Sequence, residues 1–200
     1  MYKSEKFWDR TAKYFEKTPV KIVEKIKKYL NSSDTVLDFG CATGTIVNEI
    51  ADNVKEIHGI DISSKMINIA KRKAGESKNE NAYFAQSTIF DERYKKESFD
   101  MILAFNVLHL FKDTQKIIQR INELLKKGGL FISSTVCLGE KNTFFAFFFL
   151  LLTKIRIVPY VKFFKISEFE DSITNSNFKI IETEKTFSDA YSYFIVVKKI

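Results

Sequence analysis

One short run of apolar residues, followed by a turn of small residues, constrains the fold of this chain more than any other segment. The run is Val36–Phe39, and the turn Gly40–Gly44 follows it directly. A second apolar run, His58–Ile62, carries Asp61. A strand, a glycine turn that opens a helix, and an acidic residue about 20 positions later form the arrangement in which parallel sheets hold an adenosine. The segment therefore predicts an α/β fold with a nucleoside site.

The spacing of the glycines separates two kinds of nucleoside site. A dinucleotide site uses Gly-x-Gly-x-x-Gly, which brings a pyrophosphate against backbone amides at a helix N-terminus. Here the pattern is Gly40-x-Ala42-x-Gly44, with Asp38 two positions before it. Gly40 and Gly44 permit a positive φ and a close approach of the backbone. Because a carboxylate repels a pyrophosphate and attracts an ammonium or sulfonium group, the pattern favours a cationic ligand.

These residues resemble the first motif of the class I S-adenosylmethionine-dependent methyltransferases, which reads acidic-x-Gly-x-Gly-x-Gly. Ala42 stands where the family has its middle glycine, and it adds a methyl group where the backbone and the cofactor come close. The resemblance implies that Asp38, Gly40, Ala42 and Gly44 line the cofactor site. It also implies that Asp61 accepts hydrogen bonds from both ribose hydroxyls.

The resemblance continues in order along the chain. It implies that Ile62 and Met66 flank the adenine. Three residues after the third strand are placed at the adenine edge, namely Gln86, Ser87 and Thr88. Residues 99–109 resemble the fourth strand and the loop that forms the floor of the methyl-transfer site, and Asn106 in that loop is a candidate cofactor contact. Residues 126–132 resemble the helix stop and the fifth strand of the family.

Apolar periodicity places strands and helices alternately along the chain. Five strands are predicted first, near residues 35–39, 56–60, 81–86, 99–104 and 129–136. Helices are predicted within 4–30 and near 44–53, 64–75 and 113–126. Two last strands, near 178–186 and 190–198, flank a short turn and run antiparallel to each other. We therefore expect an α/β fold, a seven-stranded and mostly parallel sheet with helices on both faces and a C-terminal antiparallel hairpin.

The whole of residues 1–200 is predicted to form a single methyltransferase domain. Within it, we assign 1–34 to an N-terminal helical lid and 35–138 to the cofactor-binding core. We assign 139–170 to an apolar insertion that shapes the acceptor site, and 171–200 to the end of the last helix and the terminal hairpin.

Composition narrows the classes of partner. A net charge of +7 is typical of nucleic-acid binders, but the lysines of segments such as Lys21–Lys28 alternate with glutamate on predicted helix faces, as on a solvated surface. Two cysteines and two histidines provide neither a disulfide framework nor the spacing of metal ligands, so no metal is expected. The first ten residues lack the apolar core of a signal peptide, and we expect a cytoplasmic protein.

His109 is the candidate general base. In-line methyl transfer depends chiefly on positioning and on the exclusion of water, and a base is useful only where the acceptor must lose a proton. His109 lies in the loop after the fourth strand, and its reference pKa is near neutrality. The alternative is that His109 packs against or caps the following segment. His58, at the start of a strand, is interpreted as structural.

Aromatic residues near the N-terminus offer a contact for the sulfonium. Phe7-Trp8-Asp9 and Tyr14-Phe15 resemble the N-terminal helix of small-molecule methyltransferases, including those of ubiquinone and menaquinone synthesis, where it covers the cofactor. Tyr14 is the candidate for a cation–π contact of about 0.5–2 kcal/mol. The alternative is that Phe7, Trp8 and Phe15 form one apolar helix face that packs on the core.

A phenylalanine-rich segment, 143–165, lies between the fifth strand and the final hairpin. Its apolar core, 144–152, is far shorter than the roughly 20 residues that span a bilayer. Three interpretations stay open. The segment is a lid over an apolar acceptor, or a surface for peripheral membrane contact or for a homodimer, or a buried core helix.

Three functions are compared. The leading hypothesis is an S-adenosylmethionine-dependent methyltransferase that acts on a small, partly apolar acceptor at oxygen, carbon or nitrogen and releases S-adenosylhomocysteine. The second is a nucleic-acid (RNA) methyltransferase, which is disfavoured because Asn106–His109 replaces the Pro-Pro-aromatic element of many base-amino methylases. The third is a non-catalytic S-adenosylmethionine-binding scaffold.

Overall fold

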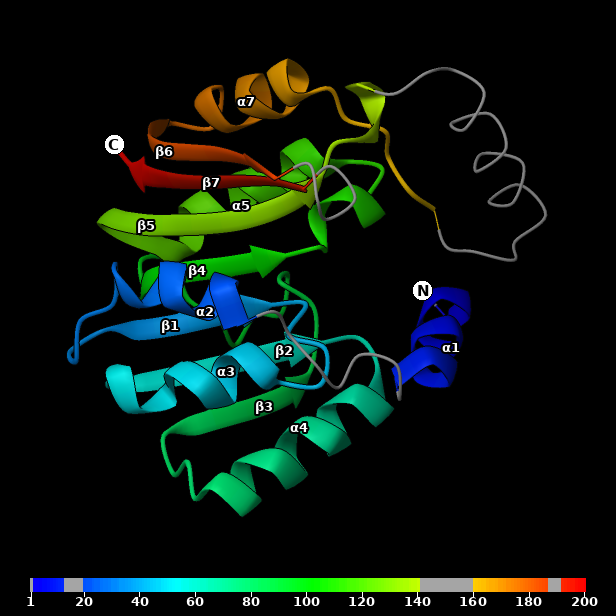
Figure 1. The fold of residues 1–200 in the computed structure, drawn as a ribbon, viewed down its shortest axis with the longest axis vertical. Helices are drawn as coiled ribbons and strands as arrows, with labels where there is room; N and C mark the ends of the chain where they lie inside the picture. The colour runs from blue at the N-terminus through cyan, green and yellow to red at the C-terminus, as the bar shows by residue number, and fades with distance from the viewer. Residues whose placement is uncertain (1, 13–19, 141–159, 187–191) are drawn as a thin grey trace.

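The structure, a computed structural model, describes residues 2–12, 20–140, 160–186 and 192–200. Seven strands form one sheet in the order β3-β2-β1-β4-β5-β7-β6 (Figure 1). Their bounds are β1 (Thr35–Phe39), β2 (Glu56–Asp61), β3 (Ala82–Gln86), β4 (Phe99–Phe105), β5 (Leu125–Val136), β6 (Phe178–Thr186) and β7 (Ser192–Lys199). The predicted seven-stranded sheet is confirmed.

The strand directions confirm the terminal hairpin. β1 pairs in parallel with both β2 and β4, and β4 pairs in parallel with β5. β7 is antiparallel to both of its neighbours, β5 and β6, so it is the one reversed strand of the sheet. Because β1 to β4 point the same way, their carboxyl ends meet at one edge, where ligands of open α/β sheets bind.

Helices cover both faces of the sheet (Figure 1). Their bounds are α1 (Tyr2–Thr11), α2 (Val20–Lys27), α3 (Thr45–Ile50), α4 (Ser64–Ser77), α5 (Thr114–Leu124) and α7 (Ile166–Thr174). One apolar cluster joins the sheet to α2, α3 and α4, and another joins it to α5 and α7. This packing places the start of α3 and of α4 beside the carboxyl ends of β1 and β2.

Two element boundaries differ from the sequence prediction by three residues or more. The predicted helix 44–53 is α3 followed by a short 3-10 helix, η2 (Ala51–Asn53). β5 begins at Leu125, four positions before the predicted start at 129. Leu125 pairs with Phe99, and the register of β4 with β5 then shifts across Gly128, which has a φ of 77°. The Gly-Gly pair is therefore an irregularity within the strand and not a stop before it.

Two predicted features reach residues outside the described ranges. The core of the phenylalanine-rich segment lies outside the described residues, as does Tyr14. Within the described ranges, no helix has the length and apolar character needed to cross a membrane.

Candidate cofactor site

The glycine turn is fixed against β2 by its backbone. The amides of Gly40 and Cys41 both donate to the carbonyl of Ile60, at 2.8 and 3.0 Å. Gly40 has a φ of 79°, and a Cβ built on it would lie 2.6 Å from Val107 Cγ2. Both the backbone conformation and the close neighbour therefore require glycine at this position.

Gly44 is required for the same two reasons at the other end of the turn. Its φ is 70°, and a Cβ there would lie 2.7 Å from the Cβ of Ala70 and from Cε1 of Phe84. Gly44 is also the residue that precedes the first turn of α3. The glycine therefore lets α3 start close to α4 and β3, at the carboxyl end of β1.

Ala42 adopts the conformation that the family's middle glycine would adopt more easily. Its φ is 47°, in the left-handed region that L residues rarely occupy. Its amide donates to Oδ2 of Asp61 at 3.1 Å. The departure from the motif therefore has a backbone consequence besides the added methyl group that the sequence indicates.

Asp61 ends β2 and faces the turn. Its Oδ1 accepts a hydrogen bond from the amide of Ser63 at 2.8 Å, and its Oδ2 accepts the one from Ala42. Burial raises the pKa of this carboxyl, while the backbone donors lower it. The two backbone donors hold the carboxylate in one orientation and leave it further acceptor capacity.

Asp38 adds a second carboxyl beside the first. Asp38 is 2% exposed. Burial is the larger cause that raises the pKa of its carboxyl to about 7, and the negative charge of Asp61 is the second cause. The same surroundings raise the pKa of the Cys41 thiol well above its usual value, with burial as the largest cause. A buried pair of acids that repel each other favours a ligand with positive charge.

The predicted adenine residues lie at the end of β3, in the loops after β2 and β3, and on the first turn of α4. The amide of Ser87 donates to the carbonyl of Asp61 at 2.9 Å, and Gln86 Nε2 donates to the carbonyl of Ile62 at 3.1 Å. Ser87 Oγ donates to Asp91, while Met66 is 2% exposed and lies on the first turn of α4. Thr88 follows in the same loop and is half-buried. The structure therefore brings the residues predicted for the adenosine to one edge of the sheet.

His109 lies at the carboxyl end of β4 in a short 3-10 helix, η3 (Leu108–Leu110). It is 8% exposed, and its Nδ1 is the one buried side-chain nitrogen or oxygen in the described part of the chain without a hydrogen-bond partner. Burial lowers its pKa to about 4. Its carbonyl accepts from the amide of Lys162 at 2.6 Å, so the described end of the phenylalanine-rich segment 143–165 contacts His109.

Asn106 stands between β4 and η3. Its side chain is exposed, and its φ is 53°. Its backbone amide donates to the backbone carbonyl of Ser134 at 2.8 Å. A left-handed conformation is common for asparagine among the non-glycine residues. The position turns the chain away from the sheet and leaves the asparagine side chain at the same edge as the glycine turn.

Two acidic residues of α1, to which the sequence analysis assigned no role, reach the site. Asp9 Oδ1 accepts from Ser63 Oγ at 2.6 Å, and Glu5 Oε1 accepts from Gln86 Nε2 at 2.9 Å. Both are ordinary acidic residues of an amphipathic helix, and no local spacing distinguishes them. The partners are 54 and 81 positions away, so only the fold brings them together.

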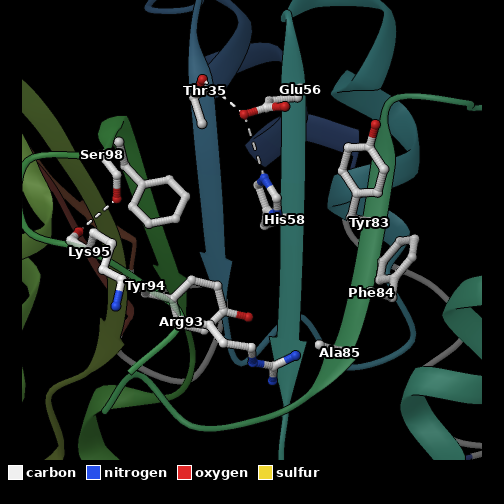
Figure 2. A pocket seen from close by; sticks show the side chains of 11 residues that line it. Thr35, Glu56, His58, Tyr83, Phe84, Ala85, Arg93, Tyr94, Lys95 and Ser98 are labelled. Atoms are coloured by element: carbon white, nitrogen blue, oxygen red, sulfur yellow. Dashed lines mark hydrogen bonds and ion pairs between the residues drawn. The ribbon is translucent and has the colours of Figure 1, made fainter. Parts of the chain in front are cut away.

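A separate pocket lies on the opposite face of the sheet from α3 and α4, with a volume of about 500 Å³ (Figure 2). His58 and Tyr83 stack there at 5.2 Å, and Glu56 lies 3.7 Å from the imidazole. Ile57, between Glu56 and His58 on β2, packs instead toward α3 and α4. The pocket is therefore distinct from the glycine turn.

The histidines and cysteines do not gather into a metal site in the part of the chain described. There, no group of three or more His, Cys, Asp or Glu side chains is arranged to hold a metal ion. Cys41 and Cys137 are both buried.

Comparison with known proteins identifies the family. Residues 30–188 match the family model of a methyltransferase domain. The chain belongs to this methyltransferase family. The resemblance to small-molecule class I methyltransferases, which use S-adenosylmethionine, is thereby confirmed, and so is the Rossmann-like methyltransferase fold.

Two relatives share about three residues in ten with this chain over the matched segments. An uncharacterised methyltransferase of Schizosaccharomyces pombe is 29% identical over 145 residues, which are 70% of this chain and 53% of the relative. A ubiquinone biosynthesis O-methyltransferase of Nitrosomonas europaea is 28% identical over 141 residues, 68% of this chain and 60% of the relative. The chain thus spans little more than half the length of these two relatives.

A solved structure agrees with the fold over nearly its full length. The crystal structure of a putative methyltransferase from Bacillus halodurans has a TM-score of 0.75 and 15% sequence identity, and the match covers 90% of this chain and 97% of that one. At this identity the likeness concerns the fold alone.

Proposed function

We propose that this chain transfers a methyl group from S-adenosylmethionine to a small, partly apolar acceptor at an oxygen, carbon or nitrogen atom. The observation that carries the proposal is the pair of carboxyls, Asp38 and Asp61, beside a glycine turn in a chain of the methyltransferase family. The relative from Nitrosomonas europaea is named for O-methylation, which supports an oxygen acceptor.

The residues present fit this cofactor. The turn from Gly40 to Gly44 has positive φ at both ends, so its backbone can come close to a ligand. Asp61 is oriented by two backbone amides and has acceptor capacity for ribose hydroxyls. Asp38 would hold a positively charged part of the cofactor, because its burial leaves a negative charge there without a full solvation shell.

Little further chemistry is required from the protein. The cofactor supplies a methyl group on a sulfonium, which is already activated for in-line displacement. The chain's residues would orient the donor, exclude water and hold the acceptor in line with it. In this proposal the lid 1–34 and the insertion 139–170 enclose the acceptor, with Tyr14 against the sulfonium.

The function is tested by binding and by turnover. We expect titration calorimetry to show binding of both S-adenosylmethionine and S-adenosylhomocysteine. Incubation with a panel of phenolic, amine and lipid-like acceptors should then transfer label from the donor methyl group. Binding without product from any acceptor would favour the scaffold hypothesis, and transfer to RNA in preference to the small molecules would favour the nucleic-acid hypothesis.

His109 is proposed as the base for a protic acceptor. Because burial lowers its pKa to about 4, the imidazole is neutral at neutral pH, and its unpartnered Nδ1 is free to take a hydrogen bond or a proton. We expect His109→Ala to lower kcat about 100-fold. Cofactor affinity should stay within about twofold, because the base acts on the acceptor.

The control for His109 is His109→Gln, which keeps hydrogen-bonding groups but cannot carry the proton. Its kcat should be as low as that of the alanine variant. Because the pKa of His109 lies well below neutrality, the kcat of the wild type should show no titration near the usual histidine value. A kcat within a few-fold of the wild type in both variants would leave His109 as a packing residue.

Cofactor affinity is expected to depend on pH through Asp38. With its pKa raised to about 7, the free protein holds a proton on Asp38 in acid solution, and a bound cation favours the ionised form and displaces that proton. The affinity should therefore fall by up to about tenfold per pH unit below pH 7 and level off above it. Asp61, whose pKa is also raised, acts with the same sign.

Calorimetry between about pH 6 and pH 8, in buffers of different ionisation enthalpy, measures both the affinity and the proton release. Asp38→Asn should bind more weakly and lose most of the pH dependence. A steep dependence that persists in Asp38→Asn would assign the titration to another group.

A further inference from the structure

Asp9 attaches helix α1 to the first turn of α4. Its Oδ1 accepts two hydrogen bonds, from Ser63 Oγ at 2.6 Å and from the amide of Lys65 at 3.2 Å. Ser63 is fully buried and is the N-cap of α4, where its Oγ also accepts from the amide of Met66. The carboxylate of Asp9 therefore adds negative charge at the N-terminus of a 14-residue helix, where the helix dipole favours it.

Ser63 also connects Asp9 to the cofactor site. Its amide donates to Oδ1 of Asp61 at 2.8 Å, while its hydroxyl donates to Asp9. The charge of Asp9 is one of the causes that raise the pKa of Asp61. Asp9, Ser63 and Asp61 thus form one chain of hydrogen bonds that runs from α1 to the proposed ribose contact.

A second attachment of α1 reaches the adenine side. Glu5 Oε1 accepts from Gln86 Nε2, which also donates to the carbonyl of Ile62. Glu5 and Asp9 lie four residues apart and so project from the same face of α1. Lys6 and Arg10 are exposed. Figure 1 shows α1 beside the start of α4, at the edge where the strands β1 to β4 end.

The attachments decide whether α1 stays in place. A ten-residue helix is marginal in water by itself, so its position depends on its contacts with the rest of the protein. The two carboxylates bond to Ser63, which follows β2, and to Gln86, which ends β3. Gln86 is one of the residues proposed at the adenine edge, and Ser63 bonds to Asp61, the proposed ribose contact. Release of α1 would therefore free both Ser63 and Gln86 at once.

We propose that Asp9 is a positioning residue of the cofactor site, which acts through Ser63 on Asp61, and that Asp9 and Glu5 hold α1 closed over the adenosine end of the bound cofactor. The inference rests on the proposed function. On this proposal, α1 controls the release of the cofactor. The acceptor oxygen Oδ1 of Asp9 is the atom on which the position of α1 chiefly depends.

The test compares Asp9→Ala, Asp9→Asn and, as a matched control on the exposed face of the same helix, Lys6→Ala. Dissociation of S-adenosylhomocysteine is followed by stopped flow, and Kd by calorimetry. Asp9→Ala should raise the dissociation rate and Kd about tenfold or more, since two hydrogen bonds to a charged group are lost. Asp9→Asn should recover most of the affinity, because its amide oxygen accepts the same two bonds. Lys6→Ala should match the wild type.

A second measurement uses the wild type alone, so it does not depend on a variant that folds. Hydrogen exchange of residues 2–11 should slow when S-adenosylhomocysteine binds, because the closed helix is stabilised by the ligand. Unchanged exchange in α1, or equal loss of affinity in Asp9→Asn and Asp9→Ala, would overturn the inference while the cofactor site stands. Absence of any binding by the wild type would overturn the proposed function together with it.

Discussion

Replacement of Asp61 by alanine is expected to lower the affinity for S-adenosylmethionine on the order of 100-fold or more. The carboxylate is already oriented by the amides of Ala42 and Ser63, so in the proposed complex it would meet two ribose hydroxyls without further ordering. A hydrogen bond to a charged group contributes about 1.5–3 kcal/mol, and two are lost together. Titration calorimetry of the variant against the wild type gives the ratio of the two dissociation constants.

A control variant and a second measurement make the Asp61 experiment specific. Asp52→Ala removes a carboxylate from an exposed position after α3, so it reproduces the change of net charge and should bind the cofactor like the wild type. Removal of Asp61 should also lower the pKa of Asp38, because the charge of Asp61 helps to raise it. Binding by Asp61→Ala within about threefold of the wild type would contradict the proposed ribose contact.

Gly40→Ala is expected to destabilise the fold by about 2–4 kcal/mol, because a left-handed conformation and an overpacked contact are both imposed on the new side chain. The added Cβ would lie 2.6 Å from Val107 Cγ2, at a φ of 79°. Thermal unfolding should show the loss as a Tm lower by roughly 5–15 °C. Cofactor affinity should fall as well, since the turn cannot keep its shape.

The matched control for Gly40→Ala is Gly75→Ala. Gly75 lies in α4, and a Cβ built there meets no atom within 4 Å. This variant should therefore stabilise the protein by about 0.5–1 kcal/mol, the usual advantage of alanine over glycine in a helix.

A double variant separates the two causes at Gly40. Val107→Ala removes the two methyl groups that the new Cβ would meet, so Gly40→Ala should cost less in that background than in the wild type. The remaining cost combines the left-handed conformation with the contact to the Cβ of residue 107, which lies 2.9 Å from the added Cβ. Equal costs in both backgrounds would show that the two methyl groups of Val107 do not contribute.

Most of the fold could be predicted from the sequence because its signals are local. Strands β1, β2 and β4 are short apolar runs between turns, and their predicted bounds agree with the structure to within one residue. The predicted start of β5 at residue 129 was wrong, because the Lys126–Gly129 segment has the composition of a helix stop when the neighbouring strand is not known. Pairing of Leu125 with Phe99 outweighs that local preference.

In the candidate site, too, local sequence signals predict some features and not others. Motif spacing places Asp38, the glycine turn and Asp61 correctly at one edge, because the carboxyl ends of consecutive parallel strands must meet there. Burial is not a property of spacing, and it lowers the pKa of His109 to about 4, which the sequence-based interpretation of a base near neutrality did not anticipate.

The sequence by itself determined the family, the order of the strands along the chain and the residues of the glycine turn, because periodicity and turn chemistry act over a few neighbouring positions. Only the tertiary structure decided that Ala42 takes a left-handed conformation held by Asp61, and that Asp9 and Glu5 attach α1 to Ser63 and Gln86. These contacts join residues 19 to 81 positions apart, and their free energy exists only once the sheet has brought those residues together.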